Sequence, residues 1–382
     1  MIYFDNAATT ALSDSVRAVM RDVMENTYGN PSSLHGIGIA AERVIKNAEK
    51  TIRALLGLTQ GELIWTSGGT EANNLAILGA ARANIGRGKR VITSAVEHPS
   101  VADAFGQLSA EGFDVVVLPV DENGQVSADA LADAVDAHTT LVSIMHINNE
   151  TGAVQDVEKL VRAAKGKNGD ILFHCDAVQS FGKHPVHPAR WGVDLLTASA
   201  HKIYGPKGTG VLYARHPARL KPILFGGGQQ KSIRPGTENV TGIAGFAQAV
   251  QDAFAGMDAA CANVAAVRMR LLQLREMAEN VHINSPLDGS PYILNVSFAG
   301  VRAEVLLHAL EGEGYAVSAG SACSSKAKYS QVLVHHGLSI QRAEEAIRIS
   351  LCAGNTVGEA DGFLAAVAKQ VQFLRKYGGV RR

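Results

Sequence analysis

The chain has 382 residues, 46% of them hydrophobic and 19% charged, which is typical of a folded protein with more than one small core. Its 36 basic and 36 acidic side chains balance, so no overall field attracts nucleic acid or an anionic membrane. Neither a signal-peptide pattern nor an apolar run of bilayer length is present, and the four cysteines show no paired spacing. These features predict a cytoplasmic protein with reduced thiols and no metal site.

Short apolar segments alternate with amphipathic helices between residues 62 and 214. We expect strands at 63–66, 90–94, 115–118, 141–145, 171–175, 195–198 and 210–213, with helices at 71–83, 101–110, 128–135 and 157–165. This alternation predicts an α/β fold with a mostly parallel sheet that is covered on both faces. In such sheets, ligands bind at the carboxyl ends of the strands.

The pattern changes after Gly242, where longer helices and fewer strands indicate a smaller α+β domain. The expected elements are helices at 243–256, 261–278, 303–310 and 359–374, and strands at 293–298, 316–317 and 347–351. We therefore predict a large domain of residues 14–252. Residues 1–13 and 253–382 are predicted to form the small domain.

Two polar segments follow expected strands directly. Lys202, in Ser199-Ala-His-Lys, can be held near apolar walls, where burial lowers the pKa of the amine and frees it to form a Schiff base. Asp176, in His174-Cys-Asp, suits the protonated pyridine nitrogen of pyridoxal phosphate. Taken alone, Lys202 could be a surface lysine in a turn, and Asp176 could be a helix N-cap. The presence of both segments together favours a cofactor site.

Two further segments fit a phosphorylated aromatic cofactor. Ser67-Gly-Gly-Thr-Glu-Ala-Asn runs from a strand into a helix, so backbone N–H groups and the Thr70 hydroxyl are available to a phosphate. His98 lies past the strand at 90–94, at the same sheet edge. A single histidine is more often structural, but this position makes it a candidate stacking partner and acid/base.

Ten such segments in order resemble the cysteine desulfurases of the NifS/IscS group, within the class-V branch of fold-type-I pyridoxal-phosphate enzymes. The matching segments begin at Tyr3 (Tyr-Phe-Asp-Asn-Ala-Ala-Thr-Thr), Gly29 (Gly-Asn-Pro-Ser-Ser-Leu-His-Gly), Ser67, Glu97, His146 (His-Ile-Asn-Asn-Glu-Thr-Gly), His174, Ser199, Arg234 (Arg-Pro-Gly-Thr-Glu-Asn), Gly320 (Gly-Ser-Ala-Cys) and Ile347 (Ile-Arg-Ile-Ser-Leu). They run nearly the whole length of the chain.

The resemblance implies a role for each residue. Lys202 is expected to hold the cofactor covalently, with His98 stacked on the ring and Asp176 at its nitrogen. The ring hydroxyl side is assigned to Gln179 and Asn149, and the phosphate to Gly69, Thr70, Ser199, His201 and Thr237. In this family the threonine comes from the partner subunit, which implies a homodimer with shared active sites. The carboxylate of the substrate, L-cysteine, is assigned to Arg348, Asn149 and Asn30.

Cys323 distinguishes sulfur transfer from amino transfer. It lies in a small, polar, lysine-containing loop, where a thiol can be partly ionised and reach a cleft. The resemblance assigns it as the sulfur acceptor that forms a persulfide and passes sulfur to another protein. An ordinary surface cysteine is the alternative. Cys175 and Cys261 are expected to be structural, with Cys261 beginning a helix, and packing is favoured for Cys352.

Three departures from the group bear on the acceptor protein. The residues after Cys323 and after Leu351 differ from the usual ones, and the chain stops soon after Tyr377, without the extension that docks a scaffold protein. The acceptor is therefore left open between an iron–sulfur scaffold, a tRNA-thiolating enzyme and another pathway. The alternatives for the chain itself are a selenocysteine lyase, a class-V aminotransferase and a catalytically silent binding subunit.

Overall fold

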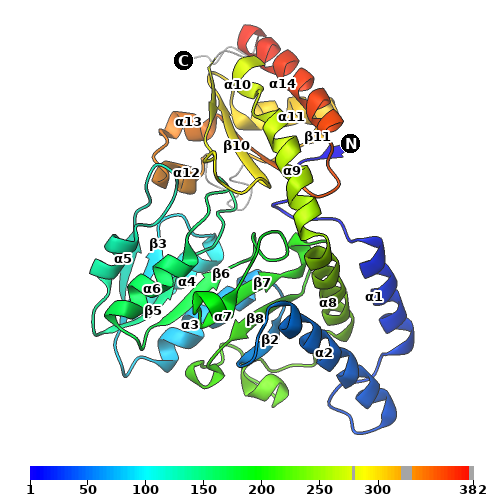
Figure 1. The fold of residues 1–382 in the computed structure, drawn as a ribbon, viewed down its shortest axis with the longest axis vertical. Helices are drawn as coiled ribbons and strands as arrows, with labels where there is room; N and C mark the ends of the chain where they lie inside the picture. The colour runs from blue at the N-terminus through cyan, green and yellow to red at the C-terminus, as the bar shows by residue number, and fades with distance from the viewer. Residues whose placement is uncertain (278–279, 320–328, 378–382) are drawn as a thin grey trace.

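A seven-stranded sheet forms the larger part of the molecule (Figure 1). The computed structural model describes residues 1–277, 280–319 and 329–377. In the order β2-β8-β7-β6-β5-β3-β4, the strands are β2 (Glu62–Thr66), β8 (Gly210–Ala214), β7 (Leu195–Ser199), β6 (Leu172–Asp176), β5 (Thr139–Ser143), β3 (Arg90–Ser94) and β4 (Asp114–Leu118). The pairs from β7 to β4 are parallel, and β8 is antiparallel to both of its neighbours. The predicted mostly parallel sheet is confirmed.

Helices cover both faces of this sheet, so its strands are apolar on both sides. The helices are α3 (Gly69–Ala83), α4 (Pro99–Ala110), α5 (Ala128–Ala134), α6 (Val157–Lys167), α7 (Pro188–Trp191) and α8 (Val240–Ala255). Phe173 of β6 packs in one core cluster with Phe246 of α8. The next residue along the strand, Leu172, faces the opposite cluster with Leu75 of α3.

Two N-terminal helices pack against α8 at the side of the sheet. They are α1 (Asp14–Asn26) and α2 (Gly36–Leu55), neither of which the sequence analysis predicts. The Ser13 side chain caps α1 by accepting a hydrogen bond from the Val16 amide.

A second group of elements lies above the first in Figure 1, and α8 leads into it through α9 (Met257–Leu271). Its antiparallel sheet has the order β12-β10-β9, formed by β12 (Ala346–Ser350), β10 (Ile293–Phe298) and β9 (Val281–Ile283). The other elements are α10 (Leu274–Met277), α11 (Ala303–Gly312), α12 (Gln331–His335), α13 (Ile340–Glu344), α14 (Val357–Tyr377), β1 (Ile2–Tyr3) and β11 (Tyr315–Ala316). Strand β1 pairs with β11, and Phe4 joins the core of this group.

The predicted boundaries after residue 242 need correction. The expected helix at 261–278 is instead α9 and α10, separated after Leu271, and Cys261 lies inside α9 rather than at its start. Gly256 ends α8 and caps α9, so the second helix begins earlier than its apolar pattern suggested. The domain boundary at 252/253 falls within α8 and stays a prediction. No helix in the described ranges is long and apolar enough to cross a membrane.

Candidate active site

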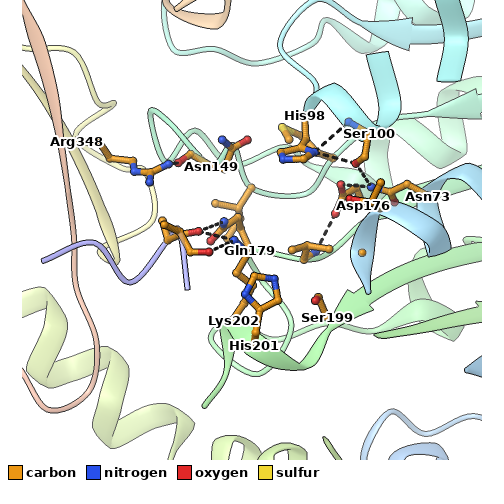
Figure 2. A pocket seen from close by; sticks show the side chains of 17 residues that line it. Asn73, His98, Ser100, Asn149, Asp176, Gln179, Ser199, His201, Lys202 and Arg348 are labelled. Carbon is orange, nitrogen blue, oxygen red and sulfur yellow. Dashed lines mark hydrogen bonds between the residues drawn. The ribbon is translucent and has the colours of Figure 1, made fainter. Parts of the chain in front are cut away.

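A cavity of about 350 Å³ lies beyond the carboxyl ends of β6 and β7, beside the starts of α3 and α4 (Figure 2). It brings together ten of the predicted site residues, namely Gly69, Thr70, His98, Asn149, Asp176, Gln179, Ser199, His201, Lys202 and Arg348. Asn30 and Thr237 do not line it in the single chain and are exposed. Cys323 lies outside the described residues.

Asp176 is the last residue of β6, and only 5% of it is exposed. Its Oδ1 accepts a hydrogen bond from the Val178 amide at 2.9 Å, and its Oδ2 accepts one from Asn73 Nδ2 at 2.7 Å. Each oxygen therefore has a hydrogen-bond donor, and the two donors fix the orientation of the carboxylate. A carboxylate held in this way can pair with a cationic ring nitrogen.

Lys202 ends a short 3-10 turn, η1 (Ala200–Lys202), that directly follows β7. Its Nζ donates to the carbonyl oxygens of Ala7 and Ala8, both at 2.7 Å. Gln179 Nε2 donates to the same Ala7 oxygen at 3.0 Å. The N-terminal segment thus holds both side chains on the cavity that Asp176 also lines.

His98 is the N-cap of α4, and its Nδ1 accepts a hydrogen bond from the Ser100 amide at 3.1 Å. Burial lowers the pKa of this imidazole, and Lys202 lowers it further, while Asp176 and Asp103 act in the opposite direction. The ring is therefore neutral near pH 7 and presents an uncharged face, which suits stacking on an aromatic ligand.

Glu97 precedes His98 in the chain and is almost fully buried. It accepts hydrogen bonds from the Ser94 hydroxyl at 2.6 Å and from the Met145 amide at 3.0 and 3.1 Å. These bonds favour ionisation, but burial outweighs them and raises the pKa of Glu97 to about 8. The side chain is a neutral acid near pH 7 and anchors the segment that leads to Asn149.

The part of the cavity that Gly69, Thr70 and Ser199 line has an unsatisfied hydroxyl. Among the described residues, Ser199 Oγ is buried and has no hydrogen-bond partner. A Cβ added to Gly69 would meet Val178 at 2.9 Å and Ser199 at 3.6 Å, so this glycine lets the start of α3 approach β7 closely. Burial and the nearby Lys202 lower the pKa of His201 to about 4. An orphaned hydroxyl beside the first, unpaired amides of a helix fits a phosphate group.

Arg348 lies at the other end of the cavity from Asp176 (Figure 2). It comes from β12, and its Nη2 pairs with Asp5 Oδ1 at 2.8 Å while its Nη1 donates to the Asn149 carbonyl at 2.9 Å. Its Nε is buried without a partner among the described residues. Because this N–H is unsatisfied, a carboxylate ligand can complete the hydrogen bonding of the guanidinium.

The sequence analysis missed three residues of this site, Asn73, Ser100 and Asp5. Asn73 follows Gly69 by four residues in α3, a spacing that places both on one helix face, so this one could have been found. Ser100 lies in the first turn of α4, where nothing in the sequence distinguishes it from an ordinary helix residue. Asp5 lies in one of the ten matching segments, but nothing local predicts its pairing with Arg348.

The other cysteines lie away from this cavity. Cys175 is fully buried in β6, as predicted. Cys352 lines a separate cavity of about 150 Å³ together with Lys183, where burial lowers the pKa of the lysine to about 7. In the described part of the chain, no cluster of His, Cys, Asp and Glu could hold a metal ion.

Residues 2–363 match the family model described as aminotransferase class-V. The chain is 40% identical to the cysteine desulfurase IscS of Dictyoglomus turgidum, over 98% of this chain and 95% of that one. A solved NifS-like protein superposes with a TM-score of 0.92 at 38% identity, covering 98% of this chain and all of the other. A structure described as SspA in complex with cysteine has a TM-score of 0.81 at 33% identity, covering 92% and 99%.

The chain therefore belongs to the aminotransferase class-V family, whose cofactor is pyridoxal phosphate. Within that family, it is a member of the NifS/IscS group of cysteine desulfurases. The residues of the cavity fit the cofactor, because a carboxylate, an amine, a neutral imidazole and an unsatisfied hydroxyl all face one space.

Proposed function

We propose that the chain takes sulfur from L-cysteine with the help of pyridoxal phosphate, releases L-alanine and leaves the sulfur on Cys323. One observation carries the proposal: Lys202, Asp176 and Arg348 line a single cavity. An amine, a partner for a ring nitrogen and a clamp for a carboxylate can therefore act on the same bound pair of molecules. The relatives named cysteine desulfurases and the SspA structure with cysteine support the choice of substrate.

Each end of the cavity is assigned one part of the cofactor. Asp176 would meet the ring nitrogen, His98 would cover the ring face, and Gln179 with Asn149 would address the ring hydroxyl. Gly69, Thr70, Ser199 and His201 would hold the phosphate. Lys202 would be the covalent anchor.

The protein residues then position the substrate and move its protons. Pyridoxal phosphate, when bound, supplies an electron sink for the negative charge that develops at the substrate Cα. Arg348 fixes the substrate carboxylate through its guanidinium, and Asn149 lies beside it. The Lys202 amine would remove the Cα proton of the substrate and return a proton in the later step. His98, neutral and buried, is available as a second proton carrier.

The sulfur step requires no outside oxidant. The Cys323 thiolate attacks the sulfur of the bound cysteine, so an S–S bond forms while the Cβ–S bond breaks. Cβ gains a proton and becomes the methyl group of alanine. Cys323 keeps the sulfur as a persulfide, which a thiolate of an acceptor protein can attack in turn.

The remaining assignments concern assembly and partners. Thr237 is exposed in the single chain, which suits contribution of its hydroxyl to the phosphate site of a second copy in a homodimer. Asn30, also exposed, stays a proposed substrate contact. We propose a large domain of residues 14–252 and a small domain of residues 1–13 and 253–382. The acceptor is proposed to be a cytoplasmic iron–sulfur scaffold or tRNA-thiolating enzyme.

The test is to replace Cys323 with alanine and to follow both sulfide release and the bound cofactor. We expect the variant to keep the visible absorption of the cofactor and to lose cysteine-dependent sulfide production, by about 10²-fold or more. The matched control is Cys261→Ala, which removes a thiol from α9, outside the cavity. Mass spectrometry after incubation with cysteine should find the extra sulfur atom on Cys323.

Two results would overturn the proposal. Undiminished sulfide release by Cys323→Ala would point to a lyase that needs no cysteine acceptor, such as one acting on selenocysteine. Conversion of cysteine without any sulfur release would point to an aminotransferase.

A further inference from the structure

Asn73 connects two residues that the proposed function uses, although no part of that function assigns it a role. It is almost fully buried on α3, and its Nδ2 donates to Asp176 Oδ2 at 2.7 Å and to Ser100 Oγ at 2.9 Å. Figure 2 shows these bonds as a continuous line from Asp176 through Asn73 and Ser100 to His98. One amide group thus contacts both the carboxylate and the hydroxyl.

The orientation of this amide follows from its neighbours. Turning it over would place its oxygen against the Asp176 carboxylate, where two acceptors repel each other. In the orientation observed, both N–H groups are used, and Oδ1 is buried with no partner in the described part of the chain. A buried carbonyl oxygen without a partner is unfavourable. The cost of leaving Oδ1 unsatisfied is therefore offset by the two hydrogen bonds that Nδ2 donates in this orientation.

The direction of these hydrogen bonds extends to His98. Because Ser100 Oγ accepts from Asn73, its own hydrogen is free to point toward His98 Nδ1, which lies 2.8 Å away. The Ser100 backbone N–H also points at Nδ1, at 3.1 Å. With two donors directed at it, Nδ1 acts as an acceptor and carries no proton, so the hydrogen of the neutral ring lies on Nε2.

We propose that Asn73 is a positioning residue that orients the Asp176 carboxylate with one N–H and fixes the Nε2–H tautomer of His98 with the other. The inference rests on the proposed function only for the tasks of Asp176 and His98. The hydrogen-bond chain itself is independent of the reaction. A single side chain thereby positions both the residue assigned to the ring nitrogen, Asp176, and the residue assigned to the ring face, His98.

The charges around His98 act alongside this chain. Burial and Lys202 lower the pKa of His98, whereas Asp176 and Asp103 raise it. Both donors that point at Nδ1, the hydroxyl and the backbone N–H of Ser100, work in the same direction as burial, because a protonated Nδ1 would lose both of them. Removing Asn73 removes the N–H that orients the Ser100 hydroxyl toward Nδ1, so the pKa of His98 should rise toward its ordinary value.

The experiment compares cofactor-free wild type, Asn73→Ala and Asn74→Ala by NMR with isotope-labelled histidine, the His98 signals being assigned with His98→Gln. Asn74 is the matched control, since its Nδ2 donates to the carbonyls of Thr70 at 2.9 Å and Ser100 at 3.3 Å. Wild type and Asn74→Ala should show the Nε2–H tautomer. Asn73→Ala should show a raised His98 pKa and should bind pyridoxal phosphate about tenfold more weakly in a titration, because Asp176 loses one donor.

A second variant, Ser100→Ala, interrupts the chain next to His98 while leaving the bond between Asn73 and Asp176. It should raise the His98 pKa at least as much as Asn73→Ala does, because it removes the hydroxyl donor itself, while the backbone donor remains in both variants. A protonated Nδ1 in wild type at neutral pH, or unchanged His98 titration in both variants, would overturn the proposal. None of these measurements depends on sulfur release, so they separate this inference from a failure of the proposed activity.

Discussion

The two ends of the active-site cavity are built in different ways. The end that contains Asp176, His98 and Lys202 is made by strand ends and helix starts of one large sheet. The end that contains Arg348 is made by β12 of the smaller sheet and by Asp5, which lies 343 positions away in the sequence. The first end is a local product of α/β alternation, whereas the second exists only when distant segments meet.

The difference extends to the state of the charged groups. Asp176 is held by two neutral donors, an amide side chain and a backbone N–H, so its charge remains available to a ligand. Arg348 is already paired with a carboxylate, and it offers the ligand a buried Nε that has no partner in the described residues. The end that contains Asp176 is therefore preorganised, and the end that contains Arg348 is balanced between an internal partner and an incoming one.

The largest effect should come from Arg348→Met, which tests whether the two ends are independent. We expect the KM for L-cysteine to rise roughly 10- to 100-fold, because a charge-assisted hydrogen bond to the substrate is lost. The affinity for pyridoxal phosphate should stay near that of wild type, since Arg348 lies away from Asp176. Steady-state kinetics and cofactor titration measure the two quantities. An equal loss of both would break the comparison.

A smaller effect is expected from Asp5→Asn, which leaves the guanidinium without its anionic partner. The free energy of unfolding should fall by about 1–3 kcal/mol, because a buried charged group loses a strong hydrogen bond. The same change in an Arg348→Met background should have little effect, as in a double-mutant cycle. Urea unfolding of the four proteins measures the coupling. Additive losses would show that Asp5 does not act through Arg348.

The effect expected from Glu97→Gln appears only as a pH dependence of stability. Burial raises the pKa of Glu97 to about 8 in the folded state, against 4.5 as its ordinary value. The wild type therefore has this contribution in full below about pH 4.5 and loses it as the pH rises toward 8, by at most about 1.4 kcal/mol per unit. Glutamine does not titrate, so the stability advantage of wild type over the variant should shrink between pH 5 and pH 8. Parallel stability profiles of the two proteins would contradict a neutral Glu97.

The sequence predicted the end that contains Asp176 well for a physical reason. Strand and helix periods are local, and the carboxyl ends of parallel strands meet at one edge, so Asp176 and Lys202 could be placed together from short segments. The structure confirms that both line one cavity. The antiparallel direction of β8, between β2 and β7, did not follow from the alternation of elements.

What could not be predicted depends on contacts between distant segments. The pairing of Asp5 with Arg348 and the bonds from Lys202 to Ala7 and Ala8 join residues about half a chain or more apart. Helix ends were also misplaced where an apolar pattern continued through a break, as after Leu271. The bonding of Asn73 lies between these cases, because its helix face was predictable while its two acceptors were not.

The N-terminal segment has a consequence for how the protein is made. Asn6 bonds to Ser350 and Asp5 to Arg348, so residues 5 and 6 have partners that are made 343 and 344 residues later. The large sheet can therefore form before β12 has been made, whereas the part of the cavity that contains Arg348 cannot.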